Sequence, residues 1–316
     1  MKRALGLPQL ALLAFFFSLL MIASCGKEKS SSGTDQEEMN ASSVSSESDG
    51  EAEMIFNGAF DDAVGVNNDV GMAGTGIFGR SAVSNTNGGL EFQRPDLCAT
   101  VTITHPGPAF FPVHVVIDFG TIGCAGPDGH IRRGKIIIDY TNRLLYPGAV
   151  AETHFDGFYV DSIHVEGTHR VENTGTVTPL VRSFSVDVTN GKLTRPNGDN
   201  TEWNSHKELL QIEGLTTLDF PRDDVFKITG HASGRVHRGT LLVAWESNIL
   251  EPLIKRFDCH WIIKGTVRTV RANNSVTSPW VATLDFGYPA IPPNPPVCDN
   301  QAQVTINGHT HTITLH

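Results

Sequence analysis

The chain has 316 residues, of which 40% are hydrophobic, so it can bury a core and is not wholly disordered. It carries 24 Lys and Arg against 34 Asp and Glu, and this acidic balance, without a basic stripe, excludes phosphate-directed binding of nucleic acid. With 31 Gly, 17 Pro and 18% charged residues, the composition is typical of a turn-rich β protein of one large or two small domains.

Residues 1–24 predict an export signal. Lys2 and Arg3 precede an apolar run from Leu10 to Ala23, which is long enough for secretion but short for a stable membrane span. The run ends in Ile22-Ala23-Ser24-Cys25-Gly26, which resembles the lipobox of bacterial lipoproteins. The resemblance implies cleavage before Cys25 and acylation of its thiol and of the new N-terminus. Several acyl chains, at ~0.8 kcal/mol per buried methylene, anchor a protein stably. The alternative is an ordinary secretory signal with a chance Cys.

The residue after Cys25 bears on localisation. It is Gly26 and not Asp, so the inner-membrane retention signal of many proteobacterial lipoproteins is missing. We therefore expect an outer-membrane lipoprotein, with a body that faces the periplasm or the cell surface. Cleavage removes Lys2 and Arg3, which leaves 22 basic against 34 acidic residues, a formal charge of −12.

Residues 25–50 are rich in Ser, Gly and acids, so we expect a solvated, flexible tether. A short amphipathic helix is predicted next, with Ser48 and Glu51 spaced as a capping box and Gly65 as a C-cap. Its apolar face is expected to dock on the β body, and its opposite face carries acids. The apolar face consists of Ala52, Ile55, Phe56, Ala59, Phe60, Ala63 and Val64. The acidic face consists of Glu53, Asp61 and Asp62.

The rest of the segment 51–97 is expected to be a Gly- and Asn-rich loop. Residues 74–79 match the G-x-G-x-x-G dinucleotide pattern, which requires a strand before it and a helix after it. Neither is predicted here, so we reject the match and expect no cofactor.

Residues 98–316 predict an all-β body, because β-branched and apolar residues alternate with polar ones between turn signals. We expect an antiparallel meander that forms a sandwich or an open curved sheet. Residues 205–213 fit either a short helix or a strand. The strand candidates are 101–103, 113–119, 135–140, 181–188, 225–229, 240–245, 261–270 and 303–315, and the turn signals are Asp128-Gly129, Asp156-Gly157, Asn190-Gly191, Asn197-Gly198 and Asn307-Gly308.

The body contains a weak internal repeat of strand, Asp-Phe-Gly, Cys and strand. The first copy runs from Cys98 through Asp118-Phe119-Gly120 to Cys124, and the second from Cys259 through Asp285-Phe286-Gly287 to Cys298. Chance similarity among short β motifs is the alternative.

Besides Cys25, four cysteines remain, and an even number in an oxidising compartment indicates disulfides. Three connectivities are possible, and the repeat favours Cys98–Cys124 and Cys259–Cys298. A zinc site would be the alternative, but no C-x-x-C pair is present.

Several motifs of the body are shared with a known group of sequences. They are residues 118–120, 124–129, 134–138, 165–168, 228–230, 259–262, 298–300 and 304–308. On these motifs the region 98–316 resembles an uncharacterised family of β-rich Bacteroidota lipoproteins. The resemblance implies an envelope location and a β-rich shape, but no activity.

Catalytic and metal-binding patterns are weak. Asp118-Phe119-Gly120 matches the kinase magnesium motif, but its companions are missing and its second copy favours a turn. His309 and His311 alternate on a predicted strand and are weak metal candidates, with His316 as a possible third ligand. The carboxylates that could serve a glycoside hydrolase are Asp156, Glu166, Asp223 and Asp224. The tryptophans that could stack on a sugar are Trp203, Trp245, Trp261 and Trp280.

The residue that we expect to be the most exposed tryptophan is Trp203, because it lies among Asn200, Glu202 and Asn204. It is therefore the one weak ligand-binding candidate. The leading hypothesis is a membrane-anchored, non-catalytic binding or structural protein, whose partner is an envelope glycan or another envelope protein. The alternatives are a carbohydrate hydrolase and a carrier for lipid or lipoprotein, which would need an open, apolar, concave sheet face.

Overall fold

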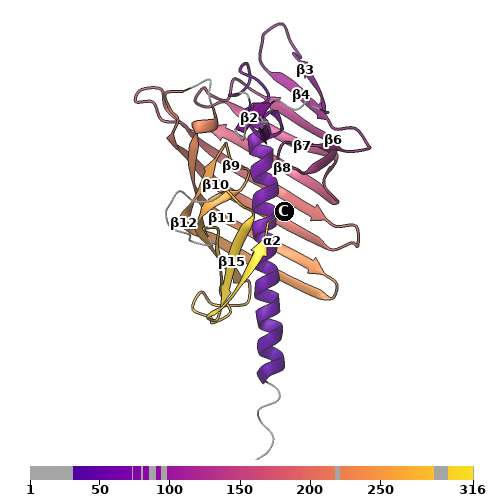
Figure 1. The fold of residues 1–316 in the computed structure, drawn as a ribbon, viewed down its shortest axis with the longest axis vertical. Helices are drawn as coiled ribbons and strands as arrows, with labels where there is room; N and C mark the ends of the chain where they lie inside the picture. Colours follow the sequence, from indigo (N-terminus) through magenta and orange to yellow (C-terminus); the bar gives the residue numbers. More distant parts are fainter. Residues whose placement is uncertain are drawn as a thin grey trace, which may run out of the picture. The chain divides into compact units, whose positions relative to one another are not determined.

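The computed structural model describes residues 31–72, 74–79, 81–84, 90–93, 98–217, 221–287 and 298–315. The chain divides into two compact units, Met1–Asn40 and Ala41–His316. Lipidation of Cys25 and the export signal lie outside the described residues. The elements are α2 (Ser31–Gly65), η1 (Gly76–Phe78), β1 (Ser81–Ser84), β2 (Leu90–Gln93), β3 (Thr100–Thr104), β4 (Val113–Asp118), β5 (Cys124–Ala125), β6 (Ile131–Tyr140), β7 (Val150–Val160), β8 (Ile163–Asn173), β9 (Ser183–Thr194), β10 (Asn200–Glu213), η2 (Pro221–Asp223), β11 (Val225–Arg238), β12 (Leu241–Arg256), β13 (Ile262–Arg271), β14 (Ala282–Asp285), β15 (Gln301–Ile306) and β16 (His309–Thr314) (Figure 1).

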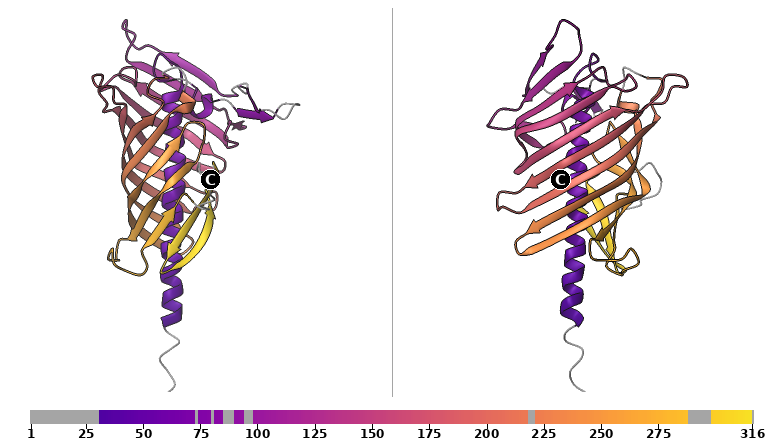
Figure 2. Two further views of the ribbon diagram at one scale, coloured as in Figure 1. Left: turned by 60° about the vertical axis from the view of Figure 1, so that its left-hand side comes forward. Right: turned by 180° about the vertical axis from the view of Figure 1, so that it is seen from behind.

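The body is one 14-stranded antiparallel sheet in the order β16-β15-β14-β13-β12-β11-β10-β9-β8-β7-β6-β4-β3, with β5 paired to β6. The strands β1 and β2 form a separate small sheet. The predicted all-β fold is confirmed as an antiparallel meander that forms an open curved sheet. Figure 2 shows the strands curving around the part of α2 that belongs to the same unit. Residues 205–213 lie in β10 and are a strand.

The helix docks on the concave face of the sheet, as predicted. Phe56 stacks on Trp203 of β10 with ring centroids 5.5 Å apart, and Phe60 contacts the edges of Phe184 and Phe226. At the end of the helix, the hydroxyl of Tyr140 donates to the carbonyl oxygen of Ala63 at 2.6 Å. The helical face predicted from the spacing of apolar residues therefore packs into the core.

The predicted tether at residues 25–50 is wrong over its described part. The helix begins at Ser31 and not near Ser48, and the Ala41–Gly50 stretch is largely buried against the sheet. Small residues permit this burial: a Cβ on Gly50 would lie 3.0 Å from the Leu284 side chain, so the helix backbone approaches β14 closely. The buried Ser45 hydroxyl donates to the carbonyl oxygen of Ala41 at 2.8 Å, which offsets the cost of removing it from water.

Two of the five predicted turns are in fact bulges within strands. Asp156-Gly157 lies inside β7 and Asn190-Gly191 inside β9, whereas the other three turn signals join consecutive strands. At Gly191 a Cβ would lie 2.7 Å from the Trp203 carbonyl oxygen and 3.1 Å from the Phe56 ring. Only glycine fits this approach. Register shifts recur in the pairings from β6 to β13, and such bulges bend a sheet so that it can surround a helix.

The two ends of the sheet carry the predicted disulfides, Cys98–Cys124 and Cys259–Cys298. The cross-links span 26 and 39 residues, for which the chain-entropy model gives a stabilisation of ~3–4 kcal/mol each. Both Asp-Phe-Gly motifs form turns, as predicted. The Asp118 carboxylate accepts the Gly120 N–H at 2.8 Å, and the Asp285 carboxylate accepts the Gly287 N–H at 2.9 Å. These motifs are therefore structural.

Candidate functional site

A row of buried acids on α2 is the most unusual feature of the interior. Asp49, Glu53, Asp61 and Asp62 are each at most 5% exposed, so the helix is buried on its predicted acidic face as well as on its apolar face. Buried carboxylates need partners, because removing an unpaired charge from water is very costly. Positions 49, 53 and 61 are multiples of four apart, so these side chains leave the helix on one side, and inward-facing residues of the sheet meet them.

The first member of the row, Asp49, binds two tryptophans. Its Oδ1 accepts the indole N–H of Trp203 at 2.8 Å and that of Trp245 at 3.1 Å. Both tryptophans are at most 2% exposed, so the aspartate supplies the hydrogen-bond acceptor that each indole would otherwise lack. Burial raises the pKa of Asp49 above its ordinary value, and the charge of Lys207 opposes this rise.

Two lysines of the sheet neutralise the next acids. Lys207 Nζ lies 2.8 Å from Glu53 Oε2, and Lys255 Nζ lies 2.8 Å from Asp61 Oδ2. The Lys207 and Glu53 side chains are 5% and 6% exposed, and the Lys255 side chain is completely buried. Burial also raises the pKa of Asp61, against the opposing charge of Lys255. These pairs fix the rotation of the helix within the sheet.

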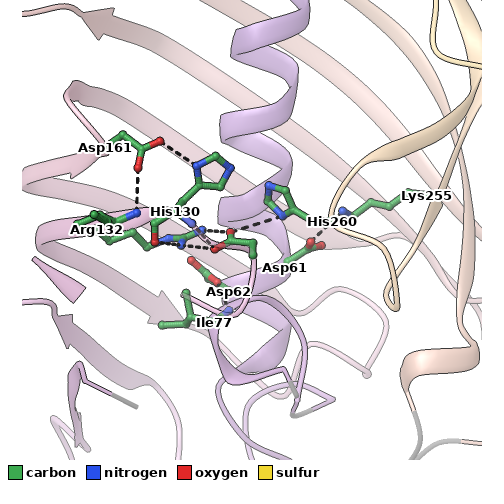
Figure 3. A network of polar contacts seen from close by, with 10 residues as sticks. Asp61, Asp62, Ile77, His130, Arg132, Asp161, Lys255 and His260 are labelled. Carbon is green, nitrogen blue, oxygen red and sulfur yellow. Dashed lines mark hydrogen bonds and ion pairs between the residues drawn. The ribbon is translucent and has the colours of Figure 1, made fainter. Parts of the chain in front are cut away.

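A second group of polar residues lies at the end of the helix, where the β5–β6 turn meets the loop before β13 (Figure 3). Arg132 of β6 donates to both carboxylate oxygens of Asp128, at 2.9 and 2.5 Å. The Nδ1 atom of His260 lies 3.6 Å from Asp128 Oδ2, and the ring centroids of His130 and His260 are 5.4 Å apart. His130 Nδ1 in turn lies 2.9 Å from Asp161 Oδ2.

The pKa values of this group follow from burial and charge. Burial opposes ionisation of Asp128, but the hydrogen bonds and the charge of Arg132 outweigh it and hold the pKa well below the usual range. Burial lowers the pKa of His260 to about 3, so this imidazole is neutral near pH 7. Burial raises the pKa of Asp62 to about 7, although its Oδ1 accepts the Ile77 N–H at 2.8 Å.

A small cavity of about 110 Å³ lies beside Asp128 and His260, and His130 is not part of its lining. Asp61, Asp62, Asp128, Arg132 and His260 all line it. Asp128, His130 and His260 each place one potential metal-ligand atom within 4.8 Å of the other two. Within the part of the chain that the structure describes, no other three His, Cys, Asp or Glu residues do so. Two imidazoles and a carboxylate are ligands typical of zinc and similar divalent ions. We call these three residues and the cavity beside them the Asp128 cluster.

The residues predicted as sites lie elsewhere. Trp203 is 1% exposed, so the prediction of an exposed ligand-binding residue is wrong. His309 and His311 lie on the edge strand β16, where His311 contacts Ser43 and Glu47, and they do not join a three-residue metal group among the described residues. His316 lies outside those residues. The glycan-binding tryptophans and carboxylates are also dispersed: Trp245 and Asp224 are buried, Trp261 and Trp280 half-buried, and Asp156, Glu166 and Asp223 exposed.

Sequence reasoning missed the Asp128 cluster because its members come from distant segments. Asp128 belongs to a turn signal and to the shared motif 124–129, and His260 belongs to the shared motif 259–262, and neither pattern indicates a metal. The buried acids of α2 did have a signal in the sequence: Lys207 and Lys255 occupy strand positions whose alternate neighbours are apolar or buried, and a lysine in that phase requires a buried acid.

A fully buried histidine beyond the cluster predicts acid sensitivity. Neither ring nitrogen of His169 has a hydrogen-bond partner among the described residues, and burial lowers its pKa to about 4, whereas its unfolded value is about 6.5. Between these values the unfolded chain binds the extra proton, so we expect His169 to remove about 3 kcal/mol of unfolding free energy as the pH falls from 7 to 4. Urea titrations of the parent and of His169→Phe across this range measure the difference.

The variant His169→Phe should lose this part of the acid dependence, whereas His237→Phe, at an exposed position, should retain it. Equal slopes of stability against pH in the parent and in His169→Phe would contradict the assignment.

Comparison with known proteins adds no relative. No family model, curated protein or solved structure matches this chain. Among the described residues, no helix combines the length and the apolar character needed to cross a membrane.

Proposed function

We propose that this chain is a lipoprotein of the bacterial cell envelope, held at the outer membrane by acylated Cys25, whose body binds an envelope partner or has a structural role. The proposal includes membership in the Bacteroidota lipoprotein family that residues 98–316 resemble. The lipobox-like residues 22–26 support the anchor, and Gly26 supports the outer membrane. The two disulfides support maturation in an oxidising compartment.

The observation on which the binding or structural role depends is the occupied concave face of the sheet. From Ala41 to Gly65, α2 fills this face with side chains such as Phe56 and Phe60, which contact rings of the sheet. A carrier for lipid would need an open apolar face here, so the packing favours a partner that binds outside. Burial of Trp203 also removes the residue that best supported sugar stacking in a hydrolase.

The convex face offers a polar surface to such a partner. A cross-strand row of paired positions runs from His114 of β4 through Asp139 and Glu152 to Arg170 of β8, and continues through Asp187, His206 and His231 to Asn248 of β12. Hydrogen bonds join members of this row at His114–Asp139 and His206–Asp187, at 2.8 and 2.7 Å. Hydrogen-bonding groups in a continuous row suit a glycan or a polar protein surface better than a lipid.

The anchor is tested by growing cells with an alkyne-bearing fatty acid and labelling the protein. We expect the parent to carry the label and to fractionate with the outer membrane, and Cys25→Ala to lose the label. Gly26→Asp, expressed in a proteobacterial host, should keep the label and move to the inner membrane. Label that persists in Cys25→Ala would contradict the anchor.

The non-catalytic part is tested separately. The purified full-length protein is incubated with peptidoglycan and with envelope polysaccharide, and new reducing ends are measured. We expect none above the level of a heat-unfolded sample. Release of reducing ends by the folded protein would overturn this part and leave the anchor unaffected.

A further inference from the structure

The Asp128 cluster brings together three potential metal ligands from two segments that are far apart in sequence. Asp128 and His130 lie in and just after the β5–β6 turn, and His260 lies between β12 and β13. One ligand atom of each lies within 4.8 Å of the others. We propose that these three side chains bind one divalent transition-metal ion of the zinc class, which links the two ends of the curved sheet.

The orientation of His130 is suited to a ligand. Its Nδ1 lies 2.9 Å from Asp161 Oδ2, so the carboxylate fixes the ring and leaves Nε2 for a metal. Histidines that bind metals usually have such a partner on the other nitrogen, which orients the ring and raises its basicity. The Asp161 carboxylate is itself held by the N–H of Ile131 at 2.9 Å.

The charge of the surroundings also favours a cation. Asp61 Oδ1 is buried without a hydrogen-bond partner among the described residues, although Oδ2 of the same group pairs with Lys255. Asp61 and Asp62 both line the cavity beside the cluster. Asp62 accepts the Ile77 N–H at 2.8 Å and is also subject to the charge of Arg132. The cavity lining holds four acids, Asp61, Asp62, Asp128 and Asp258, against two arginines, Arg132 and Arg222, so a divalent ion would offset part of the excess negative charge.

Arg132 does not saturate Asp128. It donates two hydrogen bonds to the carboxylate and the His130 N–H donates a third, to Oδ1 at 3.1 Å, whereas two carboxylate oxygens together offer about four lone-pair positions. Its positive charge is offset by Asp128, Asp62 and Asp161, which all surround it. The arginine therefore orients Asp128 and leaves an oxygen lone pair for the metal. The cavity of about 110 Å³ beside Asp128 and His260 also has room for a water bound to the ion, since one water needs ~10–15 Å³ of cavity volume.

The test uses the full-length protein in detergent, without an affinity tag, freed of metal by a chelator. We expect Zn²⁺ to bind with a stoichiometry of one ion per chain by calorimetry and to raise the melting temperature. Co²⁺ should give the visible absorption of a four-coordinate site with nitrogen and oxygen ligands. His130→Ala and His260→Ala should each weaken Zn²⁺ binding by at least about tenfold.

The matched control is the double variant His309→Ala/His311→Ala, which removes two exposed histidines of β16 and should leave stoichiometry and affinity unchanged. Circular dichroism of each metal-free variant establishes that it is folded. His260 adjoins Cys259, so if His260→Ala fails to fold, His130, which adjoins no cysteine, carries the test through His130→Ala and His130→Gln.

Three results would overturn the proposal. They are binding of less than one Zn²⁺ per chain by the parent, unchanged affinity in a folded His130→Ala variant, and loss of the bound ion in the His309→Ala/His311→Ala control.

Discussion

Replacement of Trp203 by Ala should lower the free energy of unfolding by about 3–5 kcal/mol, the range typical of large aromatic side chains removed from a core. Trp203 is 1% exposed and lies almost parallel to the Phe56 ring, at an angle of 10°. The substitution would leave a cavity between β10 and α2. It would also remove one of the two indole hydrogen bonds that the Asp49 carboxylate accepts within the core. Chemical denaturation at constant pH measures the change.

The half-buried Trp280 provides the matched control for this measurement. It lies in the connection between β13 and β14 and is only partly buried, and we expect Trp280→Ala to cost about 1 kcal/mol or less. Trp203→Phe should lie between these values, because it keeps the ring and loses the hydrogen bond to Asp49. Equal destabilisation by Trp203→Ala and Trp280→Ala would contradict the central position of Trp203 in the core.

The misassignment of Trp203 has a simple physical cause. Its exposure was predicted from polar neighbours such as Glu202 and Asn204, but side chains next to each other in a strand point to opposite faces. In β10 the alternation places Trp203, Ser205 and Lys207 inside, and Glu202 and Asn204 outside. The polar neighbours were therefore evidence for a buried tryptophan once the segment was recognised as a strand.

Patterns that depend on local chemistry were predictable from the sequence. The alternation in residues 113–118 matches the observed burial of every second side chain of β4. The disulfide pairing followed from the internal repeat, since each repeat brings its own two cysteines together. The Asp-Phe-Gly turns were predictable for the same reason, because an Asp side chain binds a backbone N–H two residues later.

Features that depend on the whole sheet were not predictable in this way. The Ser-rich segment before residue 50 has the composition of a tether, but its part from Ala41 to Gly50 is largely buried against the curved sheet. Asn190-Gly191 has the sequence of a tight turn, yet it is a bulge because Phe56 and Trp203 lie against the Gly191 backbone. The Asp128 cluster likewise forms only when the two ends of the sheet come together around the helix.

The second large effect concerns the ion pair between Lys207 and Glu53. Lys207→Met should lower the free energy of unfolding by about 3–5 kcal/mol, because it leaves the Glu53 carboxylate buried without a counter-charge. The exposed pair Arg170–Glu172 provides the contrast, since its side chains are each 37% exposed. We expect Arg170→Met to cost less than about 1 kcal/mol, because water and salt screen that pair. Denaturant titrations of both variants under one set of conditions make the comparison.

The double variant Glu53→Leu/Lys207→Met separates the cost of an unpaired charge from the worth of the pair. Apolar replacement of both partners of a buried ion pair is often neutral or stabilising, so most of the loss in Lys207→Met should be recovered. A residual deficit of about 1 kcal/mol is expected, because the Asn57 amide donates to Glu53 Oε1 at 3.2 Å and would lose this acceptor. If Lys207→Met were as mild as Arg170→Met, Glu53 would be in contact with water, and α2 would not lie inside the sheet as its acids indicate.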